Sequence, residues 1–361
     1  MPKQKRAAFQ LGDSTVQPGE IKSIDLEVGT FMTHEKLRLQ ATVIHGKEPG
    51  PTLLISGCIH GDEFNGTEII RRILRTKSVA KLKGTLLAVP VVNRPGFVRR
   101  SRYMPDRRDL NRLFPGSATG SLGARLAKVF TDQLIARSDL VIDLHTGAVN
   151  RPNFPQIRIT AGDKESMALA KVFDPPVILT ASQRESTLRA ACIDLKKPVL
   201  LYEAGEALRL DAHAIKFGVE GIMSIMRHVG MLSTRSRIRR KKTSTVISKK
   251  SYWERSPQGG IFIPLISLGK AVNKDDLLGF IADPQGSAEV KVRASFPGIM
   301  IGRTNEAVAD EGDGLFHIAH ATDVESAEDM INRSTDALPD LVGEENDHPV
   351  PYDAASESIS S

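Results

Sequence analysis

Short apolar runs alternate with segments of helical spacing along the first two thirds of the chain, and this alternation most constrains the fold. Strand-like runs occupy residues 51–56, 85–92, 139–144, 155–160, 176–179 and 197–203. Between them lie segments with apolar residues three and four apart, including 66–77, 123–138 and 211–229. Strands that are apolar on both faces and alternate with helices form largely parallel sheets with helices on both sides.

These patterns predict an α/β fold over residues 17–233, with a mixed, largely parallel sheet sandwiched by helices. Residues 21–31 and 36–46 alternate polar and apolar side chains, which predicts an antiparallel edge of the same sheet. Residues 234–256 begin with a run of cations without acids, which predicts an exposed basic linker. Glycine-broken short strands predict a smaller all-β, barrel-like domain over 257–320. The acidic residues 321–361 predict a disordered tail.

The charge is distributed unevenly. The net charge is +6, but residues 322–361 contain eleven acids and one base, so the remainder of the chain carries +16. Such a surface can attract nucleic acid, acidic lipid or small anionic substrates.

No apolar run reaches the roughly 18 residues of a membrane helix, and the first residues lack a secretory apolar region. Two cysteines form no disulfide framework. We therefore expect a cytoplasmic protein without membrane partners.

Three predicted strands end at residues capable of chemistry. The turn HGDE after the first strand holds His60 and Glu63, the strand 139–144 is followed by His145, and the strand 197–203 ends at Glu203. The carboxyl ends of parallel strands meet at one edge of a sheet, where ligands bind. Two histidines and one carboxylate are the ligand set of a catalytic zinc site with an open position for water. Glu203 is the remaining acid.

Each of these residues also has an ordinary structural interpretation. A histidine at a strand end is commonly a hydrogen-bonded structural residue, and Glu203 could pair with a nearby arginine. Cys58, two residues before His60, could compete as a soft ligand, but a small buried residue is the favoured interpretation. The order His, Glu, His and Glu, always at strand ends, favours the zinc site.

Residues 93–116 contain seven arginines, whose forked donors suit carboxylate recognition. Together, the HGDE turn, the DLNRLFPG run, the DLHTG strand end and the EAGE segment resemble the succinylglutamate desuccinylase/aspartoacylase family. This family is a branch of the zinc carboxypeptidase-like superfamily, and the likeness spans roughly residues 17 to 320. The β-rich segment resembles the family's C-terminal domain, which partly covers the active site. It is also similar to biotinyl or lipoyl domains, but it lacks their lysine motif, so no attached cofactor is expected.

The resemblance implies a zinc-carboxypeptidase-like fold and one Zn²⁺ per chain. Its ligands correspond to His60, Glu63 and His145. Glu203 corresponds to the catalytic glutamate and Arg102 to the arginine that stabilises the oxyanion. The pair that holds the substrate's carboxylate corresponds to Asn111 and Arg112. A second anchor for the substrate is not placed, and Arg158, Arg184 and Arg189 are candidates for it.

The implied function is hydrolysis of the amide bond of a small anionic N-acyl amino acid, with zinc-activated water and Glu203 as general base. Two alternatives stay open. One is a zinc carboxypeptidase acting on short peptides or acidic protein tails. The other, less favoured, is an RNA- or ribosome-associated binding protein that uses the basic residues 235–250. The acyl group and the oligomeric state, including a homo-oligomer, are also left open.

Overall fold

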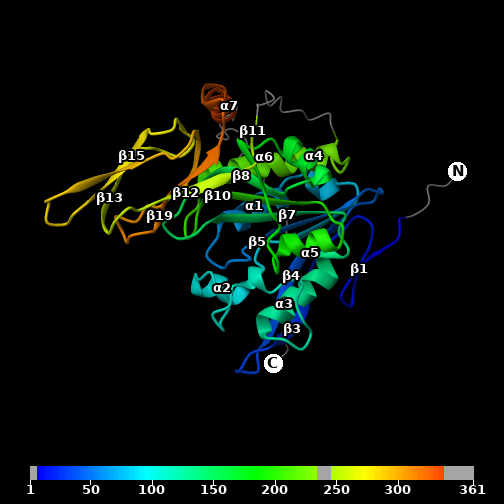
Figure 1. Ribbon diagram of the computed structural model, residues 1–361. Helices are drawn as coiled ribbons and strands as arrows, with labels where there is room; N and C mark the ends of the chain where they lie inside the picture. The colour runs from blue at the N-terminus through cyan, green and yellow to red at the C-terminus, as the bar shows by residue number, and fades with distance from the viewer. Residues whose placement is uncertain (1–5, 234–244, 337–361) are drawn as a thin grey trace.

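The computed structural model describes residues 6–233 and 245–336 of the 361-residue chain. Its centre is a mixed sheet (Figure 1). From one edge to the other, the strands are β11 (Val246–Ser248), β9 (Val177–Ala181), β8 (Asn153–Thr160), β10 (Val199–Glu206), β7 (Leu140–Gly147), β5 (Thr52–Gly57), β6 (Thr85–Val89), β4 (Lys36–His45) and β3 (Glu20–Thr30).

Among these nine strands, five of the eight pairings are parallel. The strands from β10 through β7 and β5 to β6 run in parallel, as do β8, β9 and β11. The pairs β8–β10, β4–β6 and β3–β4 are antiparallel. The predicted mixed, largely parallel sheet with an antiparallel edge is therefore confirmed. The parallel strands β5, β7 and β10 end at one edge, and this edge carries the candidate site.

Helices cover both faces of the sheet (Figure 1). Helices α1 (Asn65–Leu74), α4 (Lys164–Phe173) and α6 (Ala212–His228) pack on one face, and α3 (Leu122–Phe130) and α5 (Leu188–Asp194) on the other. A π-helical turn, Thr131–Ile135, continues α3. Successive strand residues serve opposite cores: Leu53 and Ile55 belong to the first and Leu54 to the second. Both faces are thus apolar, as parallel strands require.

Shorter elements complete the α/β part. They are the hairpin β1 (Phe9–Leu11) and β2 (Ser14–Val16), the helix α2 (Arg94–Arg99) and two 3₁₀ turns, Val79–Lys81 and Leu110–Arg112.

Polar residues precede the first residue of several helices. The side chains of Ser121, Asp163, Thr187 and Asp211 each accept a hydrogen bond from the backbone N–H three residues further on. These caps satisfy N–H groups that otherwise have no partner.

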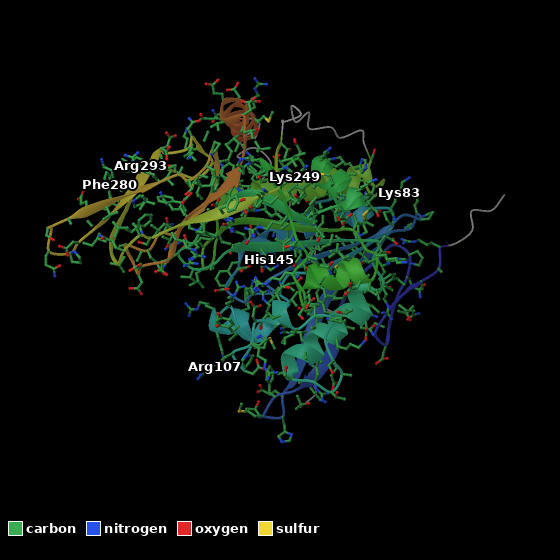
Figure 2. The ribbon with its side chains drawn as sticks, viewed as in Figure 1. Lys83, Arg107, His145, Lys249, Phe280 and Arg293 are labelled. Atoms are coloured by element: carbon green, nitrogen blue, oxygen red, sulfur yellow. The ribbon has the colours of Figure 1, made fainter. Side chains whose placement is uncertain are left out.

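The C-terminal β-rich segment is divided between two sheets. Strands β12 (Ser251–Arg255), β19 (Gly314–His320), β17 (Gly298–Arg303) and β14 (Ala271–Val272) continue the central sheet, where Gly302 pairs with Asn153. Strands β16 (Glu289–Arg293), β15 (Leu277–Ala282), β13 (Gly260–Pro264) and β18 (Val308–Ala309) form a separate sheet. Figure 2 shows Phe280 and Arg293 on this second sheet, well away from His145.

This arrangement differs from the predicted boundaries 234–256 and 257–320. Residues 246–255 of the predicted linker include β11 and all of β12, because pairing with β9 and β19 satisfies the backbone groups of these strands. Residues 234–244 lie outside the described part of the chain. The predicted disordered tail also needs correction, because helix α7 (Val324–Asp336) forms there. Ala327 and Ile331, four residues apart, are buried against the sheet edge. Residues 337–361 are not described.

None of the helices within residues 6–233 and 245–336 combines the length and apolar character of a membrane span.

Candidate active site

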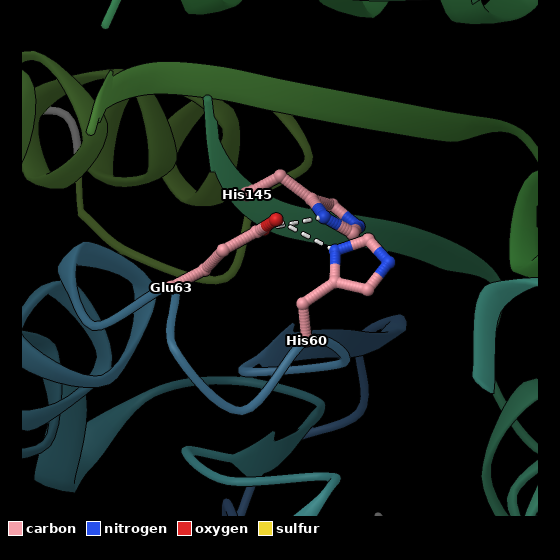
Figure 3. A group of neighbouring side chains, drawn as sticks. All are labelled: His60, Glu63 and His145. Atoms are coloured by element: carbon pink, nitrogen blue, oxygen red, sulfur yellow. Dashed lines mark hydrogen bonds and ion pairs between the residues drawn. The ribbon is translucent and has the colours of Figure 1, made fainter. Parts of the chain in front are cut away.

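Three predicted ligands meet at one point. His60 and Glu63 lie in the turn after β5, and His145 lies near the end of β7 (Figure 3). The Nδ1 atom of His60 is 2.7 Å from one carboxylate oxygen of Glu63, and the Nδ1 atom of His145 is 2.8 Å from the other. One ligand atom of each residue lies within 4.8 Å of the others, and all three side chains are buried. The geometry suits three side chains that share one metal ion.

Two aspartates orient the histidine rings. The Nε2–H of His145 donates to Asp143 Oδ2 at 2.8 Å, and the Nε2–H of His60 donates to Asp109 Oδ1 at 3.1 Å. Such hydrogen bonds fix the tautomer, so that each Nδ1 atom is turned toward Glu63 and available as a ligand. Sequence reasoning missed both aspartates. Asp143 was detectable, because residues two apart on a strand share a face.

The charges favour a cation at this point. Burial alone would raise the pKa of Glu63, but the neighbouring His60 and His145 hold it well below its usual value. Burial lowers the pKa of His145, but Asp143 and Glu63 together raise it well above the usual value. Both nitrogens of each imidazole thus face a carboxylate oxygen. A zinc ion fits this set of donors, because it would take the place of the two Nδ1 protons between the histidines and Glu63.

Glu203 faces the same cavity as this metal-binding group. It lies on β10 directly beside His145 on β7, and the cavity that both line has a volume of about 280 Å³. Its Oε2 atom is 2.5 Å from the Nε atom of Arg158. The N–H of that nitrogen is not aimed at the oxygen, so the contact is an ion pair without a hydrogen bond. His145 and Glu203 lie within strands, not beyond their ends, because the β7–β10 pairing continues to Gly147 and Glu206.

Arg102 lines the cavity next to the metal-binding group. Its Nη1 donates to Glu63 at 3.2 Å and its Nη2 to Asp109 at 3.1 Å. The amide oxygen of Asn111 accepts a hydrogen bond from the backbone N–H of Leu188, which anchors the start of α5. Arg112 donates to the carbonyl oxygen of Asn111. Neither Asn111 nor Arg112 lines the cavity, and their role in substrate binding stays a prediction.

Cys58 is a buried structural residue, as its favoured interpretation predicted. Its thiol donates to the carbonyl oxygen of Glu63 at 3.1 Å. Burial raises the pKa of this thiol to about 12, so it remains protonated at neutral pH and does not offer the thiolate that metals prefer.

Gly61 lets the HGDE turn approach helix α2. A Cβ atom on Gly61 would lie 2.1 Å from the carbonyl carbon of Gly96, a backbone atom. We expect Gly61→Ala to cost about 1–3 kcal/mol of folding free energy through overpacking, and to lower both Tm and zinc content because His60 is displaced. Gly259→Ala is the control, since a Cβ there meets only an oxygen at 3.8 Å. Thermal unfolding that leaves the Tm of Gly61→Ala equal to the control's would contradict this.

Two side chains from the C-terminal strands also line the cavity. Trp253 of β12 and His317 of β19 are directly paired neighbours in that sheet. They are about 110 and 170 residues from His145 along the chain, so no local sequence signal placed them in the site. The β-rich segment thus contributes part of the cavity's lining.

The fold and the side chains together define a class: α/β proteins that hold a two-histidine, one-glutamate group at the carboxyl edge of a parallel sheet. Within this class, residues 49–229 match the model of the succinylglutamate desuccinylase/aspartoacylase catalytic domain. The match covers half of the chain, and the chain belongs to this family.

Relatives of this chain include a deacetylase and a desuccinylase. An N-alpha-acetyl-L-2,4-diaminobutyric acid deacetylase from Halomonas elongata is 25% identical over 296 residues, covering 79% of this chain and 86% of that protein. A succinylglutamate desuccinylase from Pseudomonas aeruginosa is 33% identical over 118 residues, 30% of this chain and 35% of that protein.

Solved structures share the fold. The product-bound ectoine utilization protein EutE (DoeB) from Ruegeria pomeroyi has a TM-score of 0.74 and 26% identity, covering 83% of this chain and 95% of that chain. A succinylglutamate desuccinylase/aspartoacylase from Rhodobacter sphaeroides has a TM-score of 0.75 at 21% identity, covering 84% and 95%.

Proposed function

We propose that this protein is a zinc-dependent deacylase that hydrolyses the amide bond of a small N-acyl amino acid. The observation that carries the proposal is the buried group of His60, Glu63 and His145, which shares a cavity with Glu203. The deacetylase and desuccinylase relatives support the reaction class. The cavity of about 280 Å³ suits a small molecule.

Different residues of the chain serve different parts of the proposed reaction. His60, Glu63 and His145 would hold zinc, which when bound supplies Lewis-acid activation of water and of the amide carbonyl. Glu203 accepts a proton from the attacking water and passes it to the leaving amine. The product amine and carboxylic acid account for both halves of the cleaved amide and for the water consumed.

Arginines prepare the site for negative charge. Arg102 is held by Glu63 and Asp109, so its guanidinium is oriented before the amide oxygen becomes negative. Asn111 and Arg112, on the loop that follows, are proposed to bind the α-carboxylate. The side chain of Asn111 already fixes the loop against α5.

The direct test is an assay of the zinc-loaded protein on N-acetyl, N-succinyl and N-formyl amino acids, with detection of the free amine. We expect hydrolysis of at least one with a kcat/KM above about 10⁴ M⁻¹s⁻¹. A folded, zinc-loaded protein that leaves the whole panel intact contradicts the proposal.

The carboxypeptidase alternative is tested in parallel with short acidic peptides. Release of their C-terminal residue, with the acyl amino acids untouched, would favour it. The wall formed by Trp253 and His317 argues against long substrates, because it closes part of the cavity. The RNA-binding alternative depends on basic residues of which 235–244 lie outside the described part of the chain, and no contact among the described residues favours it.

A further inference from the structure

A fully buried glutamine, Gln156, lies beside the candidate site. It belongs to β8, and neither its Oε1 nor its Nε2 atom has a hydrogen-bond partner among the described residues. An amide that leaves water without gaining a partner destabilises the folded state. The proposed reaction does not use this residue, so the presence of an amide at this position needs another explanation.

Gln156 lies directly opposite Glu203 in the sheet. The antiparallel pairing of β8 with β10 aligns the two residues, so both side chains leave the same face. Their neighbours Ile157 and Tyr202 both belong to the core on the other face, under α1, α4 and α6. Directly opposite residues have Cβ atoms about 4.5–5.5 Å apart. A turn of the Gln156 amide therefore brings its N–H to the carboxylate of Glu203.

The contact of Glu203 with Arg158 leaves the direction of the carboxylate open. The Oε2 atom of Glu203 is 2.5 Å from the Nε atom of Arg158, but the N–H is not aimed at it. An ion pair without an aligned hydrogen bond attracts the carboxylate without fixing its direction. A general base needs a fixed direction, because it must lie about 2.6–3.2 Å from the atom whose proton it takes.

One rearrangement would pair three of these buried atoms. Arg158 lies two residues after Gln156 and thus on the same face of β8. The Nε2–H of Gln156 can donate to Glu203, while its Oε1 accepts from the Nε–H of Arg158. An amide suits this position because it carries both a donor and an acceptor. A carboxylate would repel Glu203, and an amine would repel Arg158.

We propose that Gln156 is a positioning residue for Glu203: its Nε2–H donates to the carboxylate, and its Oε1 accepts from Arg158. The amide thereby fixes one oxygen of Glu203 on the β8 side and leaves the other for the attacking water. His145 lies on β7, on the opposite side of β10 from β8. The second oxygen is thus free to face the metal-binding group. This inference rests on the proposed deacylase function.

Gln156→Met removes the amide but keeps an unbranched side chain of similar length. On the best acyl amino acid, we expect the kcat of the zinc-loaded protein to fall about 10–100-fold and KM to change less than about threefold, because Gln156 acts on the base and not on the substrate. An amide without function predicts an unchanged kcat and a higher Tm, since an unpaired buried polar group is lost. A wild-type kcat in Gln156→Met overturns the proposal.

Thr160→Val is the matched control. Thr160 lies on the same face of β8, four residues after Gln156, and its Oγ1 atom is likewise buried with no partner among the described residues. It is not opposite Glu203 in the sheet. We expect its kcat to stay close to that of the wild type. A fall as large as that of Gln156→Met would show that any change in this buried row impairs the enzyme, and would overturn the positioning role.

A double-mutant cycle with Glu203→Met tests whether the effect passes through Glu203. This substitution removes both the general base and the hydrogen-bond acceptor. In this background, Gln156→Met should change the residual kcat by less than about twofold. An equal fall of kcat in both backgrounds would overturn the proposal, because Gln156 would then act independently of Glu203.

Unfolding in urea separates failure of this inference from failure of the deacylase. The four zinc-loaded proteins of the cycle are compared by their folded-to-unfolded ratios at one urea concentration near the midpoints. We expect the effect of Gln156→Met on this ratio to differ more than about threefold between the two backgrounds. Effects that agree within about threefold overturn the contact, even where hydrolysis is found. Coupling in a wild type that hydrolyses no acyl amino acid would contradict the deacylase but retain the contact.

Discussion

Replacing Glu203 with glutamine is expected to lower kcat by about 10²–10⁴-fold while the protein keeps its zinc. Glutamine has the same shape, but its amide cannot take a proton from water or return it to the leaving amine. Glu203 is not one of the three ligand residues, although it lies beside His145 in the sheet. The measurement is kcat on the best acyl amino acid together with zinc content per chain.

Glu206→Gln is the matched control for this substitution. Glu206 is on the same strand, but its oxygens accept hydrogen bonds from the backbone N–H of Asn150 and the side chain of Asn305, and it does not line the cavity. We expect its kcat to stay close to that of the wild type. Activity of Glu203→Gln that matches the control's would remove Glu203 from the chemistry. Loss of zinc in Glu203→Gln would instead indicate a role in metal binding.

Replacing His145 with alanine is expected to remove both zinc and activity. The substitution deletes one of the two nitrogen donors and removes the imidazole that lies between Glu63 Oε2 and Asp143 Oδ2. Two like charges then lie in a buried space, which disfavours a compact site. We expect less than about 0.1 zinc per chain and no measurable turnover, because a site with two protein ligands holds zinc weakly.

His45→Ala is the control for the loss of a buried imidazole. His45 is buried, but it bonds Thr85 and the carbonyl oxygen of Ala7, away from the site. It should lose stability and keep its zinc. If His145→Ala retained as much zinc as His45→Ala, the ligand assignment would be wrong. Measuring the Tm of both variants separates metal loss from general unfolding.

The sequence predicts the central fold well, because its signals are local. The runs that became β5, β6, β7, β8, β9 and β10 are short and apolar, and the segments with helical spacing became α1, α3, α4 and α6. The period-two segments became the antiparallel pair β3 and β4. In each case, burial on one or both faces leaves a pattern within a few residues.

The C-terminal part was harder to predict because its structure depends on distant pairing. Gly302 pairs with Asn153, and Val246 with Val177, across long sequence separations that leave no local pattern. Helix α7 was missed for a different reason. Its acidic composition suggested disorder, although Ala327 and Ile331 have the spacing of a buried helical stripe.

Only part of the candidate site could be predicted from the sequence. The predictable residues are His60, Glu63, His145 and Glu203, because each lies near the end of a predicted strand and parallel strands end at one edge of the sheet. Asp109, Arg158, Trp253 and His317 reach the site from other elements, so only the folded chain brings them there. Asp109 orients the ring of His60, and the other three residues line the cavity.

Zinc content of the wild-type chain is the most direct measure of whether His60, Glu63 and His145 act as one site. The protein is purified without chelators, incubated with a zinc salt, desalted and analysed for metal by mass spectrometry. The structure leads us to expect about one zinc per folded chain. A folded wild-type protein that holds less than about 0.1 zinc per chain after this treatment would contradict the metal site and the reaction built on it.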